Sequence, residues 1–517
     1  MLTLSALLAA ARHPTAPAVT DGTGTLDWAE FIARVAGAAA QLREAGVRGG
    51  DCVALWLPNS ADYLAMIFAC ARLGVLAIHV NTRFRAAEVG SLLSRSQAGV
   101  LVTQWGFGPV DFPAILASIP QQDRLTLRLV IGRHLPSGIA GVAGLAVRGL
   151  APGGEATPDA ATPDAPCLTF TTSGTTSGPK LVLHAQRSIA GHAAEVMRAM
   201  GTDRPGSALL SAVPLCGTFG NAAAMAAVAG GAHIVCMDRF DGSDAVRLIR
   251  QHGITHAVGG DDMLARIVEA ADGQRFTTLR VFGFAAFGAA APATAATAAA
   301  IGLEPCGVYG SSEMQALFAV SHGANRLRSG GRPVCPGAEI SIRDPETGET
   351  VPSGQSGELC FRAPSRFLGY LGDDAATARA TTADGFFRSG DLGHVDGDGF
   401  VYEARLGDTL RLGGFMVNPE EIEGFIVTLP GVAGAQVVAA HGGADAVPVA
   451  FVTARPDARL DEAELLARCR QQIARFKVPA RIVIVEAFPT TDSPNGTKIQ
   501  RARLREMANA LLRETTV

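Results

Sequence analysis

Lysine is nearly absent from this chain of 517 residues. Of its 44 basic residues only Lys180, Lys477 and Lys498 are lysine, and the other 41 (44 minus 3) are arginine. The sequence also contains no basic run and no stripe in which basic and aromatic residues alternate, and its formal net charge is −4. Proteins that bind nucleic acid need clustered positive charge to neutralise phosphates. The charge pattern therefore argues against a nucleic-acid partner.

Cysteine clusters and long apolar runs are lacking as well. The nine cysteines are scattered and odd in number, with no C-x-x-C spacing, so neither a disulfide framework nor a zinc site is indicated. The longest apolar stretch, residues 222–237, is interrupted by Gly230, Gly231 and His233 and is too short to span a bilayer. The apolar residues 1–12 have no positive n-region, which favours a buried or amphipathic helix over a signal peptide. We expect a cytoplasmic protein without a membrane span.

Strand-like and helix-like segments alternate along much of the chain. Residues 53–57 and 75–80 are typical of strands, and residues 61–73 are typical of a helix that ends at Gly74. This alternation predicts an α/β fold in which helices cover the faces of parallel sheets. Further strand signals lie at 99–103, 233–237, 256–258 and 280–283.

The pattern changes twice along the chain and predicts two domains. Residues 1–404 are expected to form a large N-terminal domain of stacked α/β sheets, with a β-rich subdomain from about residue 334. Residues 405–517 are expected to form a small, mobile C-terminal α+β domain. Residues 136–166, rich in Gly, Ala and Pro, are expected to be a surface connection. In the C-terminal domain the pattern predicts helices at 419–426 and 461–473 and strands at 436–440 and 447–454.

Two of the three lysines lie in loops of the composition that binds phosphate. Lys180 ends Thr172-Ser173-Gly174-Thr175-Thr176-Ser177-Gly178-Pro179-Lys180, and Lys498 ends Asn495-Gly496-Thr497-Lys498. Glycines allow close backbone approach, and hydroxyl and amide groups can surround phosphate oxygens. The first loop does not have the spacing of a Walker A loop. A compact ammonium retained in an arginine-rich chain indicates a site where a guanidinium does not serve.

The first loop resembles the phosphate-binding signature of the acyl- and aryl-CoA synthetases, in the adenylate-forming (AMP-binding) superfamily. The resemblance extends over roughly 450 residues, and its strength lies in the order of several weak motifs. These motifs are Tyr309-Gly310-Ser311-Ser312-Glu313, Gly357-Glu358-Leu359, Leu368-Gly369-Tyr370, Ser389-Gly390-Asp391 with Arg405 beyond it, Asn418-Pro419-Glu420-Glu421-Ile422-Glu423, Phe476-Lys477-Val478-Pro479 and Gly496-Thr497-Lys498.

The resemblance implies an AMP-forming acid–thiol ligase that uses ATP and Mg²⁺, with CoA as co-substrate. A carboxylate attacks the α-phosphorus of ATP and expels pyrophosphate, so cations are needed where the two anions meet. Lys498 is implied at that point, and Glu313 with Thr175 at Mg²⁺, which makes these three the catalytic candidates. Asp391 and Arg405 are implied at the ribose. The implied nucleotide-binding set is Thr172, Ser173, Gly174, Thr175, Thr176, Lys180, Val308, Tyr309, Gly310, Ser312, Asp391, Arg405 and Lys498.

The resemblance also implies a second half-reaction, in which the small domain rotates and CoA attacks the acyl adenylate. Gly407 falls at the hinge, where the family usually has Asp or Lys, and glycine keeps rotation possible. Gly413, Gly414 and Phe415 are implied along the path of the CoA arm. A plain β-turn is the alternative interpretation of that segment.

Two departures from the family pattern fall where the acid is expected to bind. Gly217 replaces a frequent His, and Gly307 replaces a frequent polar residue. Both changes remove bulk and polarity, so we expect a roomy apolar pocket that selects by size and shape. The predicted substrate is a bulky hydrophobic acid: fatty, aryl, alicyclic or terpenoid. The predicted lining is Cys216, Gly217, Phe219, Gly220, Phe284, Ala285, Gly307, Met314 and Leu317, with Ala286 beside them.

Alternatives to a CoA ligase remain open from the sequence. They are an acyl-AMP ligase that loads a carrier protein, a luciferase-like enzyme that oxidises the adenylate, and a nucleotide-binding homologue that has lost catalysis. Retention of Lys498 argues against the last. Lys477 is as compatible with a solvated surface charge as with a functional role, so it is not placed among the catalytic residues. We expect a monomer or homodimer.

Overall fold

The structure is a computed structural model that describes residues 2–10, 13–108, 110–134, 145–150, 157–172, 180–285, 291–321, 330–406, 410–412, 415–417, 419–441, 446–473, 477–493 and 496–514. The chain divides into two compact units. The first comprises Met1–Ala286, Ala293–Ile340 and Phe361–Phe387, and the second Phe287–Pro292, Ser341–Cys360 and Arg388–Val517. The α/β class is confirmed, whereas the proposed domain boundary at residue 405 stays a prediction.

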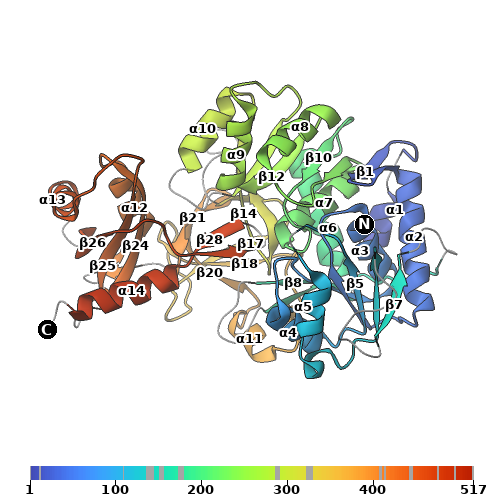
Figure 1. Ribbon diagram of the computed structural model, residues 1–517. Coiled ribbons are helices and arrows are strands. Elements are labelled where there is room, and N and C mark those ends of the chain that lie inside the picture. The colour runs from blue at the N-terminus through green and yellow to red at the C-terminus, as the bar shows by residue number, and fades with distance from the viewer. Residues whose placement is uncertain are drawn as a thin grey trace. The chain divides into compact units, whose positions relative to one another are not determined.

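One sheet of the first unit has eight strands in the order β19-β9-β8-β4-β3-β5-β6-β7. Three of them, β5, β7 and β8, are labelled in Figure 1. Its strands from β8 to β7 pair in parallel, whereas β9 pairs antiparallel with both β8 and β19. The strands are β3 (Cys52–Trp56), β4 (Leu76–His79), β5 (Val100–Gln104), β6 (Leu129–Arg133), β7 (Ala146–Gly149), β8 (Pro166–Thr171), β9 (Leu181–Ala185) and β19 (Gly369–Tyr370).

The first unit contains a second run of neighbouring strands, in the order β16-β15-β14-β13-β12-β10-β11-β1-β2. Helix α6 (Gln186–Met200) contacts β8 and β9 of the first sheet and β15 of this one, and it packs on α7 (Thr218–Gly230). These strands are β1 (Pro17–Asp21), β2 (Gly24–Asp27), β10 (Ala208–Ser211), β11 (His233–Cys236), β12 (His256–Gly260), β13 (Val281–Ala285), β14 (Pro305–Ser311), β15 (Gln315–Val320) and β16 (Gly330–Pro333).

Local sequence signals explain the ends of several helices. Helix α3 (Ala61–Leu73) begins where the Ser60 hydroxyl accepts a bond from the Tyr63 N–H, and it ends at Gly74, whose φ of 68° is left-handed. Helix α2 (Trp28–Glu44) begins with a capping box between Asp27 and Glu30. The remaining helices here are α1 (Leu4–Ala9), α4 (Ala86–Ser96), α5 (Phe112–Ser118), α8 (Gly242–His252), α9 (Asp261–Ala271), α10 (Ala291–Ala300) and α11 (Asp374–Arg379).

One segment of the first unit differs from the expectation. Residues 136–166 were expected to be a connection, but they include β7, which pairs in parallel with β6 at the edge of the sheet. Three of its four residues are exposed, so β7 lacks the alternation of buried and exposed residues that marks a strand in sequence.

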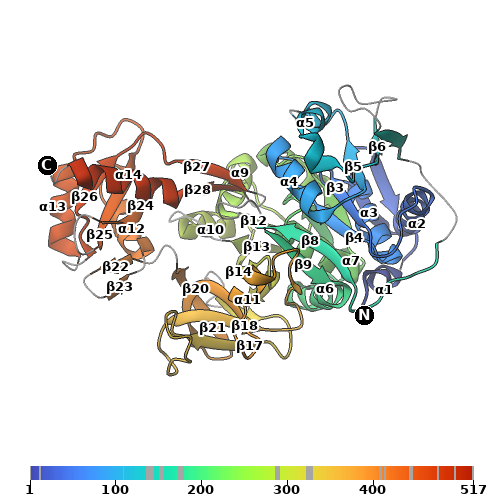
Figure 2. The same cartoon turned by 90° about the horizontal axis from the view of Figure 1, so that it is seen from below.

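The second unit contains the β-rich part, with neighbouring strands β17 (Glu339–Arg343), β18 (Gly357–Arg362), β20 (Phe387–Asp396) and β21 (Gly399–Arg405). Its C-terminal part has a three-stranded sheet, β24-β25-β26, with α14 against one face and α12 and α13 against the other (Figure 2). The bounds are β22 (Leu410–Leu412), β23 (Phe415–Val417), α12 (Pro419–Val427), β24 (Val432–His441), β25 (Ala446–Ala454), α13 (Glu462–Gln472), β26 (Arg481–Ile484), β27 (Thr490–Ser493), β28 (Gly496–Ile499) and α14 (Arg501–Glu514).

Within the described ranges, every helix is too short or too polar to cross a lipid bilayer.

Candidate active site

The β8–β9 hairpin brings the two ends of the expected phosphate loop together. Thr171 pairs with Leu181, and the Thr172 N–H donates to the Lys180 carbonyl at 3.2 Å. Residues 173–179, which include Ser173, Gly174, Thr175 and Thr176, lie outside the described residues. The hairpin therefore positions Thr172 and Lys180 at the base of this loop.

Lys180 and Glu313 both contact the side chain of one tyrosine. The Tyr370 hydroxyl donates to Glu313 Oε1 at 2.7 Å, and the Lys180 Nζ lies 4.6 Å from the centroid of the Tyr370 ring. Glu313 is buried, and its carbonyl accepts a bond from the Phe367 N–H at 2.7 Å. The sequence motif Leu368-Gly369-Tyr370 was noted, but the role of its tyrosine was missed because the contact joins three segments distant in the chain.

Glu313 lies in an irregular turn between β14 and β15. Ser311 pairs with Gln315 but Tyr309 pairs with Ala319, so β15 holds two extra residues. Gln315 (φ 67°) and Leu317 (φ 62°) both adopt left-handed backbone, which is unusual for residues of this size. A Cβ at Gly310 would lie 2.5 Å from the Gln315 carbonyl oxygen, so only glycine fits there. The backbone of this turn is therefore constrained to a conformation that requires two left-handed residues and a glycine at position 310.

Two buried histidines hold this turn from outside, and a buried glutamine of the turn itself anchors it to neighbouring segments. His184 Nε2 lies 2.8 Å from the Ser312 carbonyl oxygen, and His192 Nε2 lies 2.8 Å from that of Ala316. The Gln315 amide donates to the Ser188 and Ser365 carbonyls at 2.7 and 3.2 Å. Because a carbonyl only accepts, each histidine carries its proton on Nε2. We conclude that the backbone beside Glu313 is fixed by neutral histidines.

Burial explains why these histidines are neutral. It lowers the pKa of His184 and of His192 from 6.5 to about 4, although the carbonyl bond to each ring acts in the opposite direction. Sequence reasoning missed both residues. The only available signal was two histidines eight positions apart in an apolar segment, a pattern that core histidines also show.

The expected ribose motif lies where β20 meets β21. Asp391 pairs with Arg405 in the strand register, and Arg405 donates to Asp391 Oδ1 at 2.7 Å and to the Ser389 carbonyl at 2.9 Å. Asp391 is only 6% exposed. The structure therefore brings together the two residues that the sequence assigned to the ribose, although their contact with a nucleotide remains a prediction.

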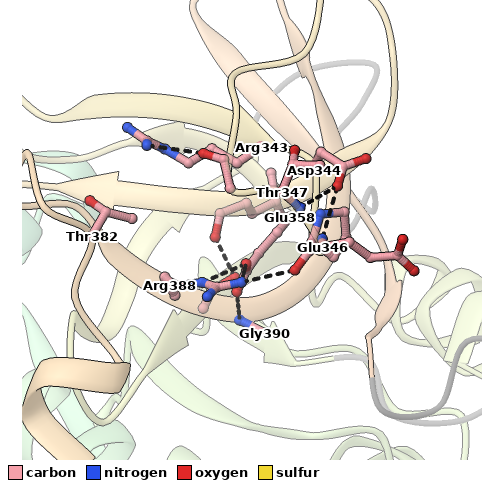
Figure 3. Close-up of polar contacts among 12 residues, drawn as sticks. Arg343, Asp344, Glu346, Thr347, Glu358, Thr382, Arg388 and Gly390 are labelled. Carbon is pink, nitrogen blue, oxygen red and sulfur yellow. Dashed lines mark hydrogen bonds and ion pairs between the residues drawn. The ribbon is translucent and has the colours of Figure 1, made fainter.

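A second carboxylate fixes the backbone of this motif (Figure 3). Glu358 Oε2 accepts from Arg388 Nε and from a terminal guanidinium nitrogen at 2.8 and 2.6 Å, and its Oε1 accepts from the Gly390 N–H at 3.2 Å. The bond to Glu358 raises the pKa of Arg388. Gly390 adopts a φ of 70°, a conformation that favours glycine. Glu358 therefore positions the turn that carries Asp391.

The residues expected around the acid belong to, or directly precede, four elements of the first unit: α7, β13, β14 and β15. Cys216 and Gly217 precede α7, whose first turn carries Phe219 and Gly220. Phe284 of β13 pairs in register with Gly307 of β14, and Ala285 follows. Met314 lies in the β14–β15 turn and Leu317 in β15, and both are buried. Ala286 lies outside the described residues.

A steric requirement that the sequence did not reveal explains why residue 220 is glycine. A Cβ at this position would lie 2.4 Å from both the Val213 and the Pro214 carbonyl oxygens. The space beside its Cα is therefore filled by backbone, and the glycine permits close packing of α7 rather than supplying room for a ligand. Its assignment to the acid pocket stays a prediction.

Lys498 and the residues expected to serve the second half-reaction belong to the second unit. Lys498 lies in β28 opposite Thr491 of β27, and Phe415 begins β23 opposite Leu412. Gly407, Gly413 and Gly414 lie outside the described residues. The roles of all five remain predictions.

Mg²⁺ fits the chemistry of Glu313, since it prefers hard oxygen ligands and usually completes its shell with phosphates and water. Among the described residues, no three His, Cys, Asp or Glu side chains gather as a metal site. A Mg²⁺ ion at Glu313 would therefore be held by this carboxylate together with the nucleotide phosphates.

Comparison with known proteins identifies the family. The model of AMP-binding enzymes matches residues 8–371, and that of the AMP-binding enzyme C-terminal domain matches residues 421–494. The chain belongs to this family. It is 31% identical to the fatty acid–[acyl-carrier-protein] ligase ScoC of Streptomyces coeruleorubidus, over 96% of this chain and 94% of that one, and 30% identical to a feruloyl-CoA synthase of Amycolatopsis, over 93% and 94%. The crystal structure of ATP-bound MatB from Rhodopseudomonas palustris superposes with a TM-score of 0.84 at 25% identity, covering 98% and 99%.

The enzyme is an AMP-forming acid–thiol ligase of the acyl-CoA synthetase type, which uses ATP with Mg²⁺ and takes CoA as co-substrate. The predicted superfamily, fold class, enzyme class and cofactors are thereby confirmed.

Proposed function

We propose that the enzyme activates a bulky hydrophobic monocarboxylic acid, of fatty, aryl, alicyclic or terpenoid type. The observation that carries this proposal is the paired position of Phe284 and Gly307 on the adjacent parallel strands β13 and β14. Buried apolar side chains, those of Phe219, Met314 and Leu317, belong to the same proposed lining. Such a lining selects by size and shape, because it offers few groups that would discriminate by hydrogen bonding. The curated relatives act on a fatty acid and on a feruloyl group, which fits this class of substrate.

The first half-reaction joins a carboxylate oxygen of the acid to the α-phosphorus of ATP and breaks its bond to pyrophosphate. Lys498 would neutralise the meeting anions, and Lys180 would bind the phosphates with the hydroxyl groups of its loop. Glu313, with Thr175, would hold the Mg²⁺ that offsets charge on the leaving group. Asp391 would accept the ribose hydroxyls, with Arg405 beside it.

The second half-reaction forms a thioester. The sulfur of CoA attacks the acyl carbon, the carbon–oxygen bond to AMP breaks, and AMP leaves with the electron pair. Gly407 would serve as the hinge, and Gly413, Gly414 and Phe415 would line the path of the CoA arm.

The proposal is tested by measuring thioester formation from ATP, Mg²⁺, CoA and a panel of hydrophobic acids by mass spectrometry. Lys498→Ala should abolish the product. Lys477→Ala decides between the two interpretations of Lys477, because retained product would mark it as a solvated charge and lost product as a functional residue. Thioester formation at equal rates in the Lys498→Ala variant would contradict the assigned role. Activation of alanine would contradict the proposed acid class, since no carboxylate in the proposed lining would pair an ammonium group.

The same assay separates the alternative acceptor. If acyl-AMP accumulates without acyl-CoA and is then transferred to a phosphopantetheinylated carrier protein, the enzyme loads a carrier. If every acid fails to support ATP–pyrophosphate exchange, the non-catalytic alternative is favoured.

A substitution in the proposed lining tests the size of the acid pocket. Gly307→Val adds a branched side chain beside Phe284, so the panel should shift toward smaller acids. ATP affinity should remain unchanged, because the substitution lies in the proposed acid site. An unaltered acid profile would remove Gly307 from the lining.

A further inference from the structure

We propose that Tyr370 is a positioning residue that sets both Glu313 and Lys180 for MgATP. Its hydroxyl would orient the carboxylate toward the metal, and its ring would hold the ammonium toward the phosphates. The inference rests on the roles proposed above for Glu313 and Lys180, and it adds a residue to which the sequence assigned no function.

Neighbouring residues fix both the backbone and the ring of Tyr370, as a positioning residue requires. Its strand β19 pairs with β9, so that Tyr370 lies opposite Val182, only two residues from Lys180. Its N–H donates to the Thr377 hydroxyl at 2.9 Å. Its ring packs edge-on against Phe367, with centroids 5.1 Å apart, and is 6% exposed. The tyrosine is therefore fixed through both its backbone and its ring.

The hydrogen bond from the Tyr370 hydroxyl makes the two carboxylate oxygens of Glu313 inequivalent. Tyr370 donates its single proton to Glu313 Oε1 at 2.7 Å. An ionised carboxylate offers two oxygens with about four acceptor directions, and one donor occupies only one of them. The bond therefore fixes the rotation of the carboxylate and leaves Oε2 free of this donor to face a metal ion. Rotational freedom that is removed in advance does not have to be lost when Mg²⁺ binds.

The ring contact gives the Lys180 ammonium an attractive partner that carries no charge of its own. The Lys180 ammonium lies 4.6 Å from the ring centroid, where the negative face of the aromatic ring attracts it. A direct ion pair between Lys180 and Glu313 would neutralise both charges. It would weaken the binding of phosphate by Lys180 and of the metal by Glu313. Tyr370 attracts the cation through the face of its ring and the anion through its hydroxyl. Neither contact neutralises a charge, so both charges would remain available for phosphate and metal.

The test measures ATP binding by calorimetry, without acid, at a series of Mg²⁺ concentrations. The readout is the ratio of the Kd for ATP without Mg²⁺ to the Kd with saturating Mg²⁺. Tyr370→Phe keeps the ring and loses the hydroxyl, so the ratio should fall roughly 3- to 10-fold while the Mg²⁺-free Kd stays constant. Tyr370→Leu loses the ring as well, so it should also raise the Mg²⁺-free Kd. Tyr402→Phe, which removes a hydroxyl from β21 outside the site, is the matched control and should change neither quantity.

Double variants distinguish positioning from general loosening of the fold. Tyr370→Phe should have little further effect on the ratio in a Glu313→Gln background, because both changes act through one carboxylate. Tyr370→Leu should likewise have little further effect on the Mg²⁺-free Kd in a Lys180→Ala background. Effects that multiply fully in both backgrounds would overturn the proposal.

The wild-type titration separates this inference from the proposed function. If wild-type enzyme binds ATP without any response to Mg²⁺, the assignments of Glu313 and Tyr370 both fail. If wild-type binding tightens with Mg²⁺ and Tyr370→Phe behaves identically, only the tyrosine proposal fails. The identity of the acid affects neither result, since no acid is present.

Discussion

Replacing Gly220 with alanine should disturb the start of α7 more than its small size suggests. The added Cβ would lie 2.4 Å from the carbonyl oxygens of Val213 and Pro214, whereas ordinary contacts begin near 3.4 Å. The obstructing atoms belong to the backbone, so no side-chain rotation relieves the overlap. Either the helix start or the preceding segment must move by about 1 Å, the difference between those two distances. That segment continues into Cys216 and Gly217, which are assigned to the acid pocket.

The expected magnitude follows from two opposing terms. Alanine is favoured over glycine inside a helix by about 0.8–1 kcal/mol. Overpacking a well-packed site typically costs about 1–3 kcal/mol, and contact with fixed backbone belongs at the upper end of that range. The net loss is therefore about 1–2 kcal/mol. It corresponds to a fall in Tm of roughly 1–3 °C, because the entropy of unfolding is about 2.1 cal/mol/K per residue and the unit is large.

Gly191→Ala is the matched control. Gly191 also lies inside a helix, α6, but a Cβ there would meet nothing within 4 Å. The only remaining effect is the higher helix propensity of alanine compared with glycine. This variant should therefore be more stable than wild type by roughly 0.5–1 kcal/mol.

Both variants are compared by differential scanning calorimetry, with acid and ATP affinities measured alongside. We expect opposite changes in Tm, and weaker binding of the acid but not of ATP in Gly220→Ala. The reasoning is refuted if Gly220→Ala melts at or above the wild-type temperature, or if both variants lose stability equally.

Two further predictions concern buried ionisable groups. Glu358→Gln should lower stability by about 1–3 kcal/mol, because it removes the charge that faces Arg388 inside the fold, and it should weaken ATP binding through Asp391. The control Glu339→Gln breaks an exposed ion pair, which solvent screens, and should cost clearly less stability than Glu358→Gln; equal losses would refute the distinction. His184 and His192 have pKa values lowered to about 4, so the unfolded chain takes up protons below pH 6.5 that the folded chain binds only near pH 4. The free energy of unfolding should therefore fall between pH 6.5 and pH 4, by roughly 3 kcal/mol for each histidine. In His184→Gln, urea denaturation should show a weaker dependence of stability on pH. An unchanged pH dependence in that variant would contradict the assignment.

Several features were determined by the sequence alone because their causes are local. Ser60 and Gly74 mark the ends of α3, since a cap needs only a hydroxyl or a left-handed glycine beside the helix. The two helices and two strands predicted after residue 418 are present as α12, β24, β25 and α13. The ordered motifs likewise identified the family, since they require only the correct residue types at successive positions along the chain.

The tertiary structure alone decided which distant groups meet. Tyr370 and Glu313 are 57 positions apart, and His184 and Ser312 are 128 apart, so no local pattern could pair them. The necessity of Gly220 depends on the backbone of Val213 and Pro214, which folds back against the start of α7. Strand β7 forms because β6 offers an edge to which it can bond. Hydrogen bonds and steric contacts between remote segments have no periodicity in the sequence, and they exist only once the chain has folded.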